Sequence, residues 1–149
     1  MLNKKINIRG FTLIELLVVV AILGIISALG TVAYNGYVAA TKRTSTENAM
    51  QQISLAQTEE YSNTGSYYES EGCDDPSVDT SNQIEVNLLG GANVLTKVNS
   101  KGKREAVSDY YVCIAVTASG YEIIALEDED EEPCKIILNN KSVWIRENC

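Results

Sequence analysis

Residues 10–16 read Gly10-Phe11-Thr12-Leu13-Ile14-Glu15-Leu16 and lie between a short basic leader and a long uncharged segment. The uncharged segment, residues 16–33, is dominated by Leu, Val, Ile and Ala. A helix that rises about 1.5 Å per residue needs roughly 20 such residues to cross a bilayer. We therefore predict a helix whose first half is able to lie in a membrane.

Glu15 is the one charged residue at the edge of this segment. An ionised carboxylate in hydrocarbon costs on the order of 2.5 kcal/mol or more, so it is expected to have a partner and a function. A secretory signal peptide does not fit, because its apolar core is about 7 to 15 residues long and is followed by the cleavage site. An ordinary single-pass anchor with an incidental glutamate stays open as an alternative.

The string from Gly10 to Leu16 resembles the processing and methylation motif of type IV pilins and of the related type II secretion pseudopilins. The resemblance implies that prepilin peptidase cuts after Gly10, that the new N-terminal Phe11 is methylated, and that Glu15 helps to register subunits during assembly. The ammonium created on Phe11 would neutralise Glu15 of a neighbouring subunit in an apolar helix bundle. The implied fold class is α+β, the pilin fold, with a long N-terminal helix packed on a C-terminal antiparallel sheet of about four strands.

We expect three segments: a prepilin leader peptide (residues 1–10), the transmembrane and assembly half of the helix (11–35), and a globular pilin domain (36–149). The leader contains three of the 12 basic residues and none of the 20 acidic ones, so its removal changes the net charge from -8 to -11. Positive charge on the leader predicts that it lies in the cytoplasm. The expected localisation is a single pass through the inner membrane with the C-terminal domain outside the cytoplasm, followed by an extracellular filament.

The helix is expected to continue to about residue 63, because residues 34–62 contain no proline and are rich in Ala, Gln, Glu and Thr. In this second half an apolar stripe recurs at helical spacing, whereas Arg43, Glu47, Gln52 and Glu59 are able to face water. The stripe consists of Ala49, Met50, Ile53, Ala56 and Tyr61. Three glycines interrupt the first half, Gly24, Gly30 and Gly36, and are either weak points in the helix or places of close helix approach.

Beyond the helix, the turn formers at residues 63–66 predict an irregular connection that extends to about residue 91. From residue 107 the alternation of strand formers and turns predicts four antiparallel strands, at residues 109–117, 121–127, 134–138 and 142–146. Four basic residues within 97–104 are expected to form a solvated loop. They are Lys97, Lys101, Lys103 and Arg104.

Four cysteines lie beyond the membrane segment and far apart: Cys73, Cys113, Cys134 and Cys149. The chain contains no histidine, which excludes mixed cysteine and histidine zinc sites, and no two cysteines are closely spaced. In an oxidising compartment an even number of cysteines predicts two disulfides, with four reduced thiols as the alternative. Of the three possible connectivities we favour Cys73 with Cys113 and Cys134 with Cys149, because the second pair closes a local loop of about 15 residues.

No enzyme and no cofactor are predicted, because the chain has no histidine base, no Gly-x-Ser-x-Gly elbow, no phosphate-binding loop and no dinucleotide fingerprint. The acidic run at residues 127–132 offers calcium ligands, but consecutive carboxylates point in different directions, and a solvated turn is favoured. Four basic residues on a domain of net charge -11 are a poor footprint for nucleic acid, so no nucleic-acid partner is expected. We expect the acidic run of one subunit to face residues 97–104 of the next.

The predicted function is a structural subunit of a type IV pilus, a major or minor pilin that polymerises through its hydrophobic N-terminal helix. The implied partners are identical or related pilin subunits, prepilin peptidase, the inner-membrane assembly platform, and membrane lipid before assembly. A pseudopilin of a type II secretion system remains an alternative. A membrane-tethered binding module that never polymerises is the alternative from a different class.

Overall fold

The computed structural model describes residues 10–128 and 132–149, with only the backbone of Val32. The chain divides into two compact units, one up to Ala40 and the other from Thr41, and each is described by itself. Apart from Gly10, the predicted leader lies outside the described residues. The expected boundary at residues 35/36, between the transmembrane half of the helix and the globular pilin domain, stays a prediction.

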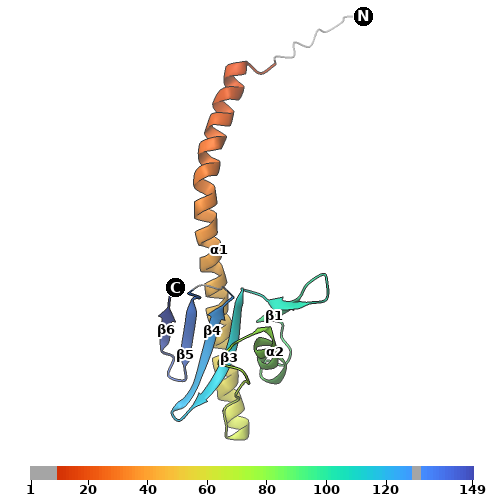
Figure 1. The fold of residues 1–149 in the computed structure, drawn as a ribbon, viewed down its shortest axis with the longest axis vertical. Helices are drawn as coiled ribbons and strands as arrows, with labels where there is room; N and C mark the ends of the chain where they lie inside the picture. Colours follow the sequence, from red (N-terminus) through yellow and green to blue (C-terminus); the bar gives the residue numbers. More distant parts are fainter. Residues whose placement is uncertain (1–9, 129–131) are drawn as a thin grey trace, which may run out of the picture. The chain divides into compact units, whose positions relative to one another are not determined.

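Helix α1 (Leu13–Thr64) begins in the first unit and ends in the second (Figure 1). In the first unit its apolar side chains from Leu13 to Leu29 are exposed, and the exposed fraction of the large ones lies between 48% for Val19 and 82% for Leu13. Among the described residues, α1 is the one helix long and apolar enough to cross a membrane. The helix passes through Gly24, Gly30 and Gly36 without a break, and a Cβ at each position would meet no atom within 4 Å.

In the second unit one face of α1 packs on a sheet. The predicted stripe is confirmed for Ala49, Met50 and Ile53, which are 4%, 0% and 0% exposed. It is wrong for Tyr61, which is 48% exposed. The polar side chain of Gln57, which is not part of the predicted stripe, is fully buried instead. The helix ends where Gly65, at φ 79°, donates its backbone N–H to the carbonyl of Tyr61 at 2.9 Å, a common helix C-cap.

The sheet contains β3 (Tyr110–Thr117), β4 (Gly120–Glu127), β5 (Lys135–Asn139) and β6 (Trp144–Glu147), in that order and all antiparallel (Figure 1). The predicted strands are confirmed to within two residues. One face of the sheet supplies alternate buried side chains to the core around α1, as the period of two along a strand requires. These side chains are Val112, Ile114, Ile123, Ala125, Ile136 and Leu138. The α+β fold class is confirmed.

The prediction of an irregular connection to about residue 91 is wrong, because helix α2 (Val78–Asn87) lies within it. Its buried members are Thr80, Ser81, Ile84 and Glu85. Three of these four side chains are polar, so the helix shows no apolar periodicity from which it could be predicted.

The predicted loop at residues 97–104 is wrong at both ends. Strands β1 (Thr96–Val98) and β2 (Arg104–Ala106) pair as a separate antiparallel ribbon, and only residues 99–103 form its turn. The Oδ1 atom of Asn99 accepts the backbone N–H groups of Lys101 and Lys103 at 2.9 and 3.0 Å, and Gly102 adopts φ 77°. Lys97 and Arg104 therefore belong to strands, while Lys101 and Lys103 are exposed.

Candidate functional site

The segment before α1 holds the predicted cleavage and methylation residues. Gly10, Phe11 and Thr12 precede the helix and are exposed, and the side chain of Phe11 is 88% exposed. A Cβ on Gly10 would meet no atom within 4 Å, so the described structure leaves the backbone at this bond open to approach. The geometry is compatible with cleavage between Gly10 and Phe11, which stays a prediction.

Glu15 closes a hydrogen-bonded ring with Thr12 at the first turn of α1. Its Oε2 atom accepts the backbone N–H of Thr12 at 2.8 Å and the hydroxyl of Thr12 at 2.7 Å. In return, the backbone N–H of Glu15 donates to Oγ1 of Thr12 at 3.3 Å. This reciprocal pattern is a capping box, which satisfies backbone donors that lack partners at the start of a helix.

The expected partner of Glu15 was the Phe11 ammonium of a neighbouring subunit, and the structure shows a partner in the same chain. Sequence reasoning missed Thr12, although Thr-x-x-Glu directly before an apolar run is a recognised signature of a helix N-terminus. Both contacts use the Oε2 atom, and a carboxylate accepts further hydrogen bonds through its other oxygen, so pairing between subunits does not require loss of this capping box. That pairing stays a prediction.

Comparison with known proteins identifies a known motif in this segment before α1 and in the first half of the helix. Residues 5–31 match the model of a protein family described as the prokaryotic N-terminal methylation motif. The chain therefore carries the N-terminal motif of type IV pilins, and the resemblance seen at residues 10–16 is confirmed.

The individual relatives are fimbrial proteins. The chain is 59% identical over 34 residues to the type IV major fimbrial protein FimA of Dichelobacter nodosus, and equally to that of strain VCS1703A. The match covers 23% of this chain and 21% of the relative, so the chain spans about a fifth of the length of the curated relatives it matches. No solved structure matches the chain. The similarity is to a structural protein and is confined to the N-terminal region.

All four cysteines are joined in the structure, Cys73 to Cys113 and Cys134 to Cys149. This pairing is the one favoured from the sequence. The Cα atoms of the two pairs are 5.4 and 4.7 Å apart, within the usual range for disulfides. The first bond ties the segment after α1 to β3, and the second ties the end of the chain to the residue before β5.

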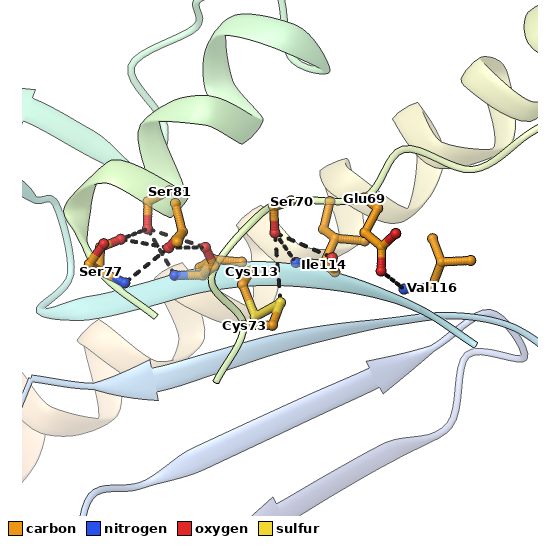
Figure 2. Close-up of a disulfide and its surroundings, with 10 residues drawn as sticks. Glu69, Ser70, Cys73, Ser77, Ser81, Cys113, Ile114 and Val116 are labelled. Carbon is orange, nitrogen blue, oxygen red and sulfur yellow. Dashed lines mark hydrogen bonds between the residues drawn. A yellow bond between two sulfur atoms is a disulfide. The ribbon is translucent and has the colours of Figure 1, made fainter. Parts of the chain in front are cut away.

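The outer edge of β3 is closed by side chains instead of another strand (Figure 2). Alternation along the β3–β4 pair turns the backbone groups of Val112, Ile114 and Val116 away from β4. Ser70 Oγ accepts the N–H of Ile114 at 2.7 Å, and Ser81 Oγ accepts the N–H of Val112 at 2.8 Å.

Two further side chains bond to this edge. The hydroxyl of Thr80 donates to the carbonyl of Val112 at 3.1 Å, and Glu69 Oε1 accepts the N–H of Val116 at 3.3 Å. Open strand edges invite pairing with other chains, and covering the edge prevents it. Residues 69–81, held to β3 by the disulfide at Cys73, therefore take the place of a fifth strand.

The β1–β2 ribbon is anchored by one buried carboxylate. Glu85 is 1% exposed, and its Oε1 atom accepts the N–H groups of Leu95 and Thr96 at 2.6 and 2.9 Å. The hydroxyl of Thr96 donates to the other carboxylate oxygen and accepts a hydrogen bond from Arg104 at 2.9 Å. Every buried side-chain polar atom in the described part of the chain has such a partner.

A polar hollow of about 380 Å³ contains both basic and acidic residues of the same chain, including Lys103, Arg104, Asp109 and Asp128. The hydroxyl of Tyr111 donates to Asp128 at 2.6 Å, and this hydrogen bond raises the pKa of Tyr111 to about 12. The basic residues thus have acidic neighbours within one molecule, and the expected pairing with the acidic run of another subunit stays a prediction.

The acidic run itself extends over residues 127–132, and its members 129–131 lie outside the described residues. Among the residues that are described, no three His, Cys, Asp or Glu side chains are grouped so that they could hold a metal ion. The solvated turn that the sequence favours for this run stays a prediction.

Proposed function

We propose that the chain is a subunit of a type IV pilus, cleaved and N-methylated by prepilin peptidase and then polymerised through α1. One observation carries this proposal: the methylation motif at residues 5–31 leads directly into a helix whose apolar side chains are exposed from Leu13 to Leu29. So large an apolar surface requires lipid or other apolar helices around it. Before assembly it lies in the inner membrane, and in the filament it packs against the same helix of other pilin subunits.

Processing is the first step to test. Cleavage after Gly10 yields a mature chain that begins with N-methylated Phe11, and mass spectrometry of the purified protein reads this N-terminus directly. Gly10→Val is expected to block cleavage, because a branched side chain at this position hinders access of the peptidase to the backbone. Gly36→Val, in the same helix but away from the motif, is the matched control and should be cleaved. An intact Met1, or a cut after the apolar segment, would rule out the proposal.

Assembly is the second step, and it depends on Glu15. The carboxylate caps its own helix through Thr12 in the free subunit and pairs with the Phe11 ammonium of a neighbour in the filament. Thr12→Ala removes the cap at a cost of about 1 kcal/mol but keeps the charge, so filaments still form. Glu15→Gln keeps most of the cap but removes the charge, so filament yield falls while the second unit stays folded. Wild-type yields of filament from both Glu15→Gln and Glu15→Ala would show that the charge has no role.

A pseudopilin of a secretion system would be processed in the same way. The fimbrial identity of the relatives favours the pilus, since both FimA sequences are described as major fimbrial proteins. Deletion of the gene separates the two functions: loss of surface filaments in electron micrographs supports the pilus, whereas a defect in protein export alone supports the pseudopilus. A chain that keeps its leader and stays monomeric would be a membrane-tethered binding module instead.

A further inference from the structure

A groove of about 290 Å³ lies on the second unit, bounded by side chains of α1, β5, β6 and the turn between the two strands. Its lining residues are Gln51, Ser54, Leu55, Leu138, Ser142 and Trp144. None of them is charged, although 21% of the residues in the chain are. The groove is therefore an uncharged site on a strongly acidic protein.

Three neutral polar groups of the groove are uncommitted. The amide of Gln51, the hydroxyl of Ser142 and the indole N–H of Trp144 have no hydrogen-bond partner within the described residues. Beside them, Leu55 is a leucine that is 72% exposed. Small-molecule sites combine apolar surface with a few convergent polar groups in this way, and their volumes begin near about 300 Å³.

The indole ring is held in place by its neighbours. The guanidinium carbon of Arg146 lies 5.5 Å from the ring centroid of Trp144, within the range of a cation–π contact. Arg146 Nε donates to Glu47 on α1 at 2.8 Å, and this hydrogen bond raises the pKa of Arg146. The arginine therefore stays charged and connects the ring to the helix that forms the other side of the groove.

The position of Ser142 costs conformational energy. Its φ of 61° lies in the left-handed region, which is unfavourable for a residue with a Cβ. The turn is shaped by Asn139, whose Oδ1 atom accepts the N–H groups of Lys141 and Val143 at 2.9 and 3.0 Å. A glycine at position 142 would remove this strain without changing the turn. The chain therefore has a serine at a position whose backbone conformation favours glycine.

We infer that this groove binds the ring of a neutral sugar. A pyranose has a face of C–H groups that packs on an indole, and a rim of hydroxyls that both donate and accept hydrogen bonds. A charged ligand would find no counter-charge among the lining residues, and a purely apolar ligand would desolvate three polar groups without pairing them. A neutral pyranose avoids both costs.

Trp144 is the only tryptophan in the chain, so its fluorescence reports on this groove alone. The mature full-length chain is titrated in a phosphocholine detergent, because a maltoside would itself present a sugar. The panel consists of methyl glycosides of neutral hexoses and of N-acetylhexosamines. At least one of them should change the emission saturably, with a dissociation constant on the order of 1 mM, which suits a ligand of about a dozen non-hydrogen atoms. Sorbitol, which has the hydroxyls but no ring, should leave the emission unchanged.

Variants separate binding from folding. Gln51→Ala should raise the dissociation constant about fivefold, as the loss of one hydrogen bond predicts. Gln52→Ala, which is the next residue on α1 and does not line the groove, is the matched control and should bind like the parent. Ser142→Gly should weaken binding while the melting temperature stays the same or rises, because the strain is relieved.

Three results would overturn the inference. One is an emission that no glycoside of the panel changes. A second is an emission that changes only with protein concentration, which would assign the groove to contact between copies of the chain. Equal affinities of the parent, Gln51→Ala and Ser142→Gly would likewise place the sugar somewhere other than this groove.

Discussion

Replacing the two serines that close the edge of β3 tests the account of residues 69–81 most directly. Ser70 and Ser81 are 5% and 0% exposed, and each accepts one backbone N–H of β3. The substitutions Ser70→Ala and Ser81→Ala leave the N–H groups of Ile114 and Val112 without these acceptors. Neither substitution removes an apolar contact, so the effect on stability isolates the hydrogen bonds.

The expected magnitude follows from the burial of the two amides. Val112 and Ile114 are 1% and 0% exposed, and a buried donor left without a partner costs about 1–3 kcal/mol. Neighbouring contacts persist, because Ser70 still donates its own N–H to the carbonyl of Ile114 at 3.0 Å. We therefore expect each substitution to lower the free energy of unfolding by about 2 kcal/mol. The second unit has 109 residues (149 − 40), so the melting temperature should fall by roughly 10 °C.

Urea denaturation and thermal scans of the mature protein measure these changes, and hydrogen exchange reports on the two amides themselves. The amide of Ile114 should lose protection in Ser70→Ala, and that of Val112 in Ser81→Ala. Ser100→Ala, at an exposed position in the turn of the β1–β2 ribbon, is the control and should change stability by no more than about 0.5 kcal/mol. If both edge variants behaved like this control, water would be satisfying the amides and residues 69–81 would not act as a substitute strand.

Three further predictions concern other parts of the second unit. Because the pKa of Tyr111 is raised to about 12 by its hydrogen bond to Asp128, its stabilising effect is complete below about pH 10 and disappears as the pH rises through 12. Ultraviolet titration should show one late phenol that is absent from Tyr111→Phe, and an unchanged titration curve would exclude that hydrogen bond. Glu85→Ala should cost about 3 kcal/mol or more, and Glu85→Gln clearly less, because glutamine keeps an acceptor for the two backbone N–H groups; equal denaturation midpoints for the two variants would contradict this role. Non-reducing peptide mapping should join Cys134 to Cys149, and replacing both by serine should cost about 3 kcal/mol for a separation of 15 residues; any other pairing refutes the assignment.

Features encoded by neighbouring residues could be predicted from the chain alone. The membrane-compatible helix follows from a long run without charge, and the four strands of the sheet follow from the alternation of strand formers with turns at residues 118–120 and 139–141. The methylation motif is equally local, since it is one continuous stretch of the sequence, residues 5–31. These patterns can be recognised without knowledge of the tertiary structure, because each depends only on side chains that are close in sequence.

Features that depend on distant partners were decided by the tertiary structure. Helix α2 buries hydroxyls because the open edge of β3 needs acceptors, and nothing within residues 78–87 reveals that need. Gln57 is buried because its amide pairs with both backbone groups of Tyr68, and Glu85 is buried because three donors converge on it. A polar side chain is predicted to be exposed unless its partners are known, and those partners come together only when the chain has folded.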